Sequence, residues 1–111
     1  MSALDRLRKI CLAFPEAEEN VGHGHPVFNI RKKCFAAFEP HRGHHAIAVR
    51  IDPLDAGIFE NDDRFFPTPY GRGAWISIWA DGKIDWKLVR QLVEQSYRMV
   101  APKKRAILRR P

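Results

Sequence analysis

Three short apolar segments, separated only by turn-forming residues, constrain the fold of this chain more than any other feature. In the third of them, Ile47, Val49 and Ile51 alternate with smaller or polar residues, as in a strand with one buried face. Connections this short join antiparallel neighbours, because parallel strands need a long crossover. The sequence therefore predicts an antiparallel sheet built from successive hairpins, with its strands at residues 27–30, 34–38 and 45–51.

A helical pattern precedes these strands. Apolar residues recur at helical spacing over residues 3–14, and Ser2 with Asp5 resembles a capping pair at the start. Pro15 is expected to end this helix, because proline cannot continue the hydrogen-bond ladder. The acidic and glycine-containing stretch 16–24 is predicted to be a connecting loop.

A short helix, a loop and one further strand follow the hairpins. Pro53 suits the first position of a short helix over residues 54–60. Residues 61–73 contain two prolines, two glycines and several aromatics, and are predicted to form an ordered loop. Residues 74–80 show the clearest strand pattern of the chain.

The C-terminal helix completes the predicted domain. Asp85 is a good N-cap and Pro102 is expected to end the helix, whose apolar face is Val89, Leu92, Val93, Ser96 and Val100. The element order predicts an α+β fold, with an antiparallel sheet of about four strands and helices packed on one side. We assign residues 1–102 to one domain and residues 103–111 to a basic C-terminal tail.

The positive charge of the chain is concentrated at its C-terminus. The formal net charge is +6, and removing the five lysines and arginines of residues 103–111 leaves about +1 for the rest. A basic tail attracts polyanions only generically. Cys11 and Cys34 lack a CxxC spacing and are expected to be buried thiols. With no apolar run of roughly 18 residues and no signal-peptide pattern, we expect a cytoplasmic protein without membrane contact.

Short motifs distributed along nearly the whole chain resemble those of the MmcQ/YjbR-like proteins of bacteria. The motifs are Gly24-His25-Pro26-Val27-Phe28, Lys33-Cys34-Phe35-Ala36, Phe66-Pro67 with Tyr70-Gly71, Gly73-Ala74-Trp75-Ile76, Asp85-Trp86, and the run from Ser96 to Lys104. The resemblance implies an α+β fold like that of the frataxin homologue CyaY, also described as a double-wing DNA-binding arrangement. It implies no catalytic residues, because the family has no agreed activity.

Contact with nucleic acid, DNA being the expected partner, is the strongest functional candidate. The residues that we assign to it are cations at predicted turns and at the end of the chain: Arg31, Lys32, Lys33, Arg42, Arg72, Lys103, Lys104 and Arg105. Hairpin tips place long cationic side chains where they reach phosphates without burying charge. The competing interpretation is that cations at exposed turns only confer solubility.

Trp75 and Trp79 share one face of the predicted strand over residues 74–80 and suggest an alternative function. If this apolar face is exposed, it can serve a homodimer or another protein partner, or stack the bases of a single strand. If it is covered, the two tryptophans belong to the core.

Signatures of catalysis and of metal binding are absent from the sequence. There is no GxSxG, HExxH, phosphate loop or dinucleotide fingerprint. Five histidines fall into two groups, without a cysteine or carboxylate at a recognised ligand spacing: His23 and His25, and His41, His44 and His45. We therefore assign no catalytic residue, no metal and no cofactor, and favour a non-enzymatic function.

Overall fold

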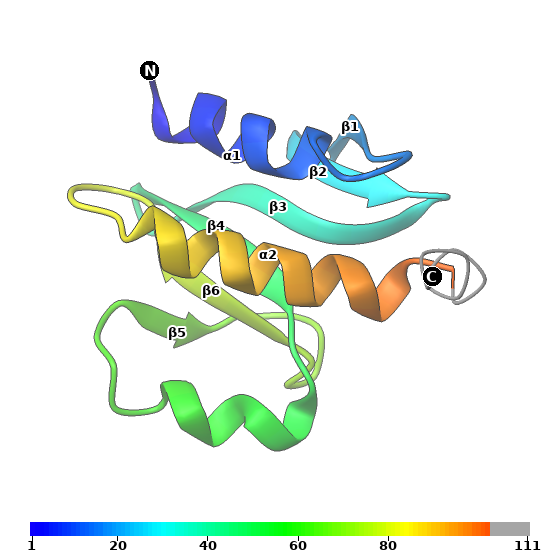
Figure 1. The fold of residues 1–111 in the computed structure, drawn as a ribbon. Helices are drawn as coiled ribbons and strands as arrows, with labels where there is room; N and C mark the ends of the chain where they lie inside the picture. The colour runs from blue at the N-terminus through cyan, green and yellow to red at the C-terminus, as the bar shows by residue number, and fades with distance from the viewer. Residues whose placement is uncertain (103–111) are drawn as a thin grey trace.

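Three successive two-residue turns organise the sheet in the computed structural model, which describes residues 1–102 (Figure 1). They connect β1 (Glu18–Gly22), β2 (His25–Ile30), β3 (Lys33–His41) and β4 (His44–Arg50) as consecutive antiparallel hairpins. Both residues of every turn have positive φ, between 48° and 83°. This is the type I′ geometry, whose twist matches that of the flanking strands. The predicted hairpins and the predicted α+β class are thereby confirmed.

The sheet has six strands rather than about four, in the order β1-β2-β3-β4-β6-β5. The clearest predicted strand is present as β6 (Trp75–Trp79), which pairs with β4. The two additional strands, β1 and β5 (Phe65–Pro67), form the edges and lie in segments that we expected to be loops. An edge strand faces solvent on one side, so β1 consists mainly of polar residues and lacks the alternation of a half-buried strand.

Two helices cover one face of this sheet (Figure 1). They are α1 (Ala3–Leu12), which begins with the predicted capping box of Ser2 and Asp5, and α2 (Trp86–Val100), which Asp85 caps. A short 3₁₀ helix, η1 (Pro53–Phe59), joins β4 to the β5 edge. None of the helices in residues 1–102 has the length and apolar character needed to cross a membrane.

The hydrophobic core lies between the helices and the sheet. Cross-strand pairing of Ile47 with Ile78 and of Val49 with Ile76 places these four side chains on the helix-covered face. The helices contribute buried side chains from α1 (Leu7, Cys11) and from α2 (Val89, Leu92, Val93, Tyr97). The predicted apolar faces of both helices are therefore the faces that pack.

Ser96 attaches α2 to the sheet by hydrogen bonds as well as by packing. Its hydroxyl donates to the carbonyl oxygen of Phe35 at 2.5 Å and accepts from the backbone N–H of Arg50 at 2.9 Å. At the next residue of α2, Tyr97 stacks on Phe14 at 4.7 Å, and the Tyr97 hydroxyl donates to the carbonyl of Pro15. These contacts hold the C-terminal half of α2 near the start of β3.

Replacing Arg42 with asparagine is expected to raise the free energy of unfolding by about 0.5–1 kcal/mol. Arg42 has a φ of 51° in the β3–β4 turn, and asparagine adopts this left-handed conformation with less strain than arginine. Urea unfolding measures the change. Arg90→Asn is the control, because Arg90 is an exposed position inside α2 where asparagine lowers helix propensity. A lower stability for Arg42→Asn would contradict the assigned turn geometry.

Candidate nucleic-acid interface

The β2–β3 turn carries three of the predicted nucleic-acid-binding residues. Arg31 and Lys32 are the central residues of the turn and Lys33 begins β3; all three side chains are exposed. Arg31 Nε donates to Glu16 Oε1 at 3.1 Å, in an ion pair whose arginine side chain is 64% exposed. Exposed pairs of this kind contribute about 0–1 kcal/mol and are screened by salt, so the guanidinium can exchange Glu16 for a phosphate.

Arg72 reaches the same end of the sheet from a different loop. It is exposed and lies three residues before β6. Trp75, the first residue of β6, pairs with Arg50, the last residue of β4. Arg50 Nε in turn donates to the carbonyl of Cys34, one residue into β3, at 2.7 Å. Arg72 and the cations of the β2–β3 turn therefore lie at one end of the sheet.

Arg42 lies at the opposite end of the sheet. It is exposed in the β3–β4 turn, while Lys33 starts β3 at the other end of that strand. β3 has nine residues, and at about 3.3 Å per residue the two turns are roughly 26 Å apart. The structure thus separates Arg42 from the other four turn and loop cations.

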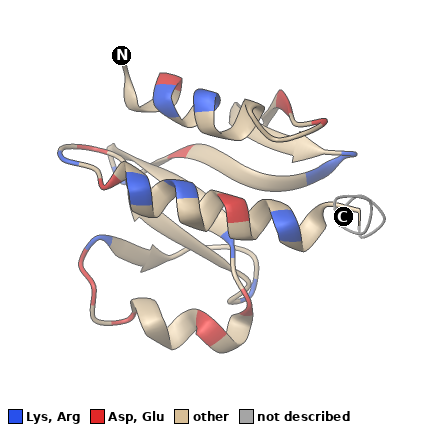
Figure 2. Ribbon diagram, viewed as in Figure 1, with Lys and Arg blue, Asp and Glu red and all other residues tan. Residues whose placement is uncertain are grey.

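Lys103, Lys104 and Arg105, the remaining predicted residues, lie outside the described part of the chain. The last described residue, Pro102, follows α2, and Ser96 joins α2 to Phe35 near the start of β3. Figure 2 shows the C-terminal end of α2 on the same side of the molecule as the blue β2–β3 turn.

Acidic residues are also present at this end. Glu16 and Glu18 are exposed near the start of β1. Since Glu18 pairs across the strands with Asn29, it lies close to the β2–β3 turn. The end of the sheet therefore has an excess of cations without being purely cationic, which suits weak binding to a polyanion.

Within residues 1–102 no helix covers the second face of the sheet, which is covered in part by its own side chains. Trp79 packs on Phe66 at a ring distance of 4.3 Å, and Trp75 lies beneath the Arg50 guanidinium at 5.1 Å. Both tryptophans are half-buried, so neither belongs fully to the core or fully to the surface. Ala48 is fully buried on this face.

Three buried polar side chains on this second face, Glu39, Thr68 and Ser77, were not anticipated from the sequence. Glu39 is 9% exposed, accepts a hydrogen bond from the Tyr70 hydroxyl, and lies 3.4 Å from His25 Nε2. The hydroxyls of Thr68 and Ser77 are 2.8 Å apart. Burial and the neighbouring carboxylate raise the pKa of Tyr70, which keeps the phenol a neutral donor. The hydrogen bonds of Thr68 and Tyr70 hold the loop that carries Arg72 against the sheet.

A glycine at the turn of this loop is required by close contact. Gly71 has a φ of 87°, and a Cβ atom there would lie 2.4 Å from Trp75 Cδ1. Arg72 and Gly73 continue the run of positive φ. The positive φ angles of residues 71–73 and the hydrogen bond of Tyr70 therefore both fix the conformation of this loop. Together they set the position of the Arg72 backbone.

The histidines do not assemble a metal site. Within residues 1–102, no group of three or more His, Cys, Asp or Glu side chains is placed to hold a metal ion. His41 stacks on Phe66 at 4.4 Å, whereas His44 Nδ1 lies 2.9 Å from Asp81 Oδ2. The backbone N–H of His45 also donates to Asp81, and these contacts lower the pKa of that carboxyl.

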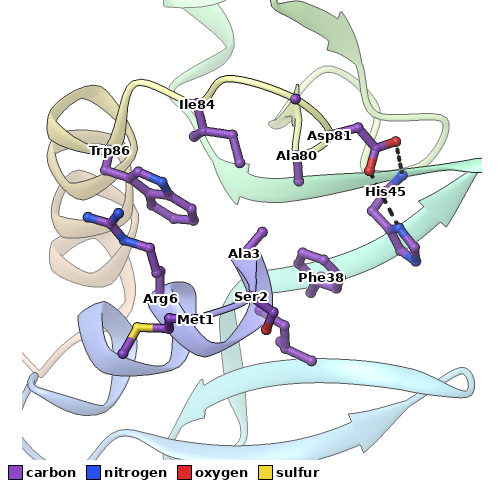
Figure 3. Close-up of a pocket in the computed structure, with 12 residues that line it drawn as sticks. Met1, Ser2, Ala3, Arg6, Phe38, His45, Ala80, Asp81, Ile84 and Trp86 are labelled. Atoms are coloured by element: carbon purple, nitrogen blue, oxygen red, sulfur yellow. Dashed lines mark hydrogen bonds and ion pairs between the residues drawn. The ribbon is translucent and has the colours of Figure 1, made fainter.

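A groove of about 550 Å³ lies at the end of the molecule away from the β2–β3 turn, between the start of α1 and the β6–α2 loop (Figure 3). Arg6 and Trp86 form one wall, and Asp81 with His45 forms the other. Apolar side chains line the space between these walls: Ala3, Leu4, Phe38, Ala80 and Ile84.

Comparison with known proteins identifies a family and a fold. The model of the YjbR family matches residues 12–99. No curated protein matches the chain. A structure of a Deinococcus radiodurans protein with a DUF419 domain is 19% identical, with a TM-score of 0.77, and the match covers 94% of this chain and 82% of that one.

Two further structures share the fold. A Pseudomonas syringae protein is 13% identical at a TM-score of 0.74, with 87% of this chain and 97% of that one covered. A Bacillus subtilis protein of the DUF1801 family is 18% identical at a TM-score of 0.58, with 86% and 74% covered. At these identities the likeness concerns the fold alone.

Proposed function

Because this protein belongs to the YjbR family and carries exposed cations from two loops at one end of its sheet, we propose that it binds nucleic acid weakly, with DNA as the partner. Arg31, Lys32, Lys33 and Arg72 are the contacting residues. Lys103, Lys104 and Arg105, which follow α2 in the sequence, add further contacts. The observation that carries the proposal is that the β2–β3 turn and the Arg72 loop lie at the same end of the sheet.

The chemistry of these residues favours contacts with phosphates over contacts with bases. Lysine and arginine at exposed turns neutralise phosphates and release condensed counterions, a contribution that does not depend on base sequence. The four contacts at the β2–β3 turn and the Arg72 loop alone predict that the logarithm of the affinity falls with the logarithm of the salt concentration, with a slope of about −3 to −4, and contacts from Lys103, Lys104 and Arg105 would make this slope steeper. We therefore expect binding with little sequence preference that is lost at high salt.

Replacing Arg31 with asparagine is expected to weaken binding to a duplex DNA about threefold to tenfold at low salt, and to reduce the salt slope by about 1. Arg31 has a φ of 48°, which asparagine adopts readily, so the turn keeps its shape. Fluorescence anisotropy with a labelled duplex, at several salt concentrations, measures both quantities.

Arg42→Asn is a matched control for this experiment. Arg42 occupies the same position of the same turn type, is also exposed, and lies at the opposite end of the sheet. It is expected to leave the affinity and the slope unchanged. Equal losses for Arg31→Asn and Arg42→Asn would mean that only net charge matters. If neutralising Lys103, Lys104 and Arg105 with glutamine abolished binding while Arg31→Asn had no effect, the proposed interface would be wrong.

A homodimer or another protein complex through the second face of the sheet is the other candidate. It is supported by the partial exposure of Trp75 and Trp79, on a face that no helix of residues 1–102 covers. Sedimentation velocity at several protein concentrations tests it. We expect a concentration-dependent shift that Trp79→Ala reduces, and a monomer at all concentrations would exclude the homodimer.

A further inference from the structure

The groove of Figure 3 combines an apolar surface with an uneven distribution of charge. Its apolar side chains Leu4, Phe38, Ile84 and Trp86 are partly buried and continuous with the core. Its volume falls within the roughly 300–1,000 Å³ that small-molecule sites occupy. The groove is thus large enough for a small molecule with an apolar body. None of the proposed DNA-contacting residues among residues 1–102 lines it.

The carboxylates around this groove are already engaged. Asp81 interacts with His44 and His45, as described above. Asp5 accepts from the backbone N–H of Ser2 and from Arg8. Asp85 accepts from the backbone N–H of Leu88 as the N-cap of α2. These contacts compensate part of the negative charge of Asp5 and Asp81 and direct Asp85 toward the backbone of α2.

Arg6 is the complementary group. Its guanidinium lies 5.0 Å from the centre of the Trp86 ring, and within residues 1–102 the guanidinium nitrogens form no ion pair or hydrogen bond. Stacking on an aromatic ring restricts the long side chain while leaving its planar set of N–H donors available. A guanidinium restricted in this way loses less conformational entropy when it binds a carboxylate.

We propose that this groove binds an anionic small molecule with a flat apolar body, such as an aromatic carboxylate. The carboxylate accepts hydrogen bonds from the Arg6 guanidinium beside Trp86. The ring lies against Phe38 and Ile84, where Ala3 and Ala80 leave room for it. This site is separate from the proposed DNA contacts at the other end of the sheet.

Two probes with the same ring and opposite charge test the proposal. Naphthalene-2-carboxylate and 2-(aminomethyl)naphthalene are titrated separately into the full chain, and binding is followed by ¹H–¹⁵N chemical shifts. We expect the carboxylate to bind at least fivefold more tightly, with the largest shifts at Arg6, Ala80 and the Trp86 indole N–H. Equal affinities, or the largest shifts outside the groove, would overturn the proposal.

Variants of Arg6 separate charge recognition from apolar contact. Arg6→Gln is expected to weaken carboxylate binding about tenfold without weakening binding of the amine, which the Arg6 charge repels. Arg6→Lys keeps the charge but loses the planar donors, so we expect an intermediate loss. Arg90→Gln removes an exposed cation of α2 that does not line the groove, and is expected to change neither affinity.

The outcomes are independent of DNA binding. Arg31→Asn is expected to weaken DNA binding without altering carboxylate binding, and Arg6→Gln the reverse. If Arg6→Gln left the affinity for the carboxylate unchanged, the inferred role of Arg6 would be wrong, whatever the result with DNA.

Discussion

Replacement of Phe35 by alanine is expected to lower the free energy of unfolding by about 3–5 kcal/mol, the largest loss that we predict for a single substitution. Phe35 is fully buried in β3, between the sheet and both helices. Its ring meets Tyr97 of α2 edge-on at 5.3 Å and Phe14, just after α1, at 6.3 Å. Removing the ring leaves a cavity where three elements meet, and the surrounding structure can relax only partly to fill it.

Urea unfolding at 25 °C measures this loss as a lower transition midpoint. Leu54→Ala is the control, because Leu54 is 92% exposed in η1 and its truncation is expected to change the free energy of unfolding by less than about 0.5 kcal/mol. A similar small change for Phe35→Ala would contradict the packing of β3 against α1 and α2.

Ser96→Ala is expected to cost about 2–4 kcal/mol, although it removes a single oxygen atom. The hydroxyl is fully buried and satisfies two backbone groups on neighbouring strands, the carbonyl of Phe35 and the N–H of Arg50. Without it both groups are left buried with one partner fewer, and each unsatisfied group costs about 1–3 kcal/mol. The same measurement of unfolding in urea applies.

Gln95→Ala is the matched control for Ser96→Ala, since Gln95 is the preceding residue of α2 and is exposed. Alanine has a high helix propensity, so no loss of stability is expected there. A loss at Ser96 no larger than that at Gln95 would mean that water replaces the hydroxyl. The position of α2 relative to the β2–β3 turn would then depend on packing alone.

Local features of the chain were predictable from the sequence. The hairpin turns, the Ser2 capping box and the Asp85 N-cap each depend on a few neighbouring residues. The edge strands β1 and β5 were not predicted, because hydrogen bonds from β2 and β6 create them. The burial of Glu39 was missed for a related reason: the residues that satisfy it, Tyr70 and His25, are distant in sequence.

The candidate interface was predictable in part. The sequence identifies exposed turns that carry lysine and arginine, and residues 1–102 of the structure place those cations at the surface. Which of them lie together depends on strand direction. Consecutive hairpin turns fall at alternate ends of a sheet, so Arg42 is separated from Arg31 by the length of β3.

By itself, the sequence determined the α+β class, the β2–β3 and β3–β4 hairpins, the helix caps and the type of residue at each of these turns, because these follow from short-range periodicity and backbone preference. Only the tertiary structure decided that Arg72 joins the β2–β3 turn, that Glu39 is buried, and that Arg6 and Trp86 line a groove. These arrangements depend on the pairing of β6 with β4 and on the docking of α1 beside α2. Contacts between segments so far apart in the chain depend on the packing of the whole core, and a short stretch of sequence does not predict them.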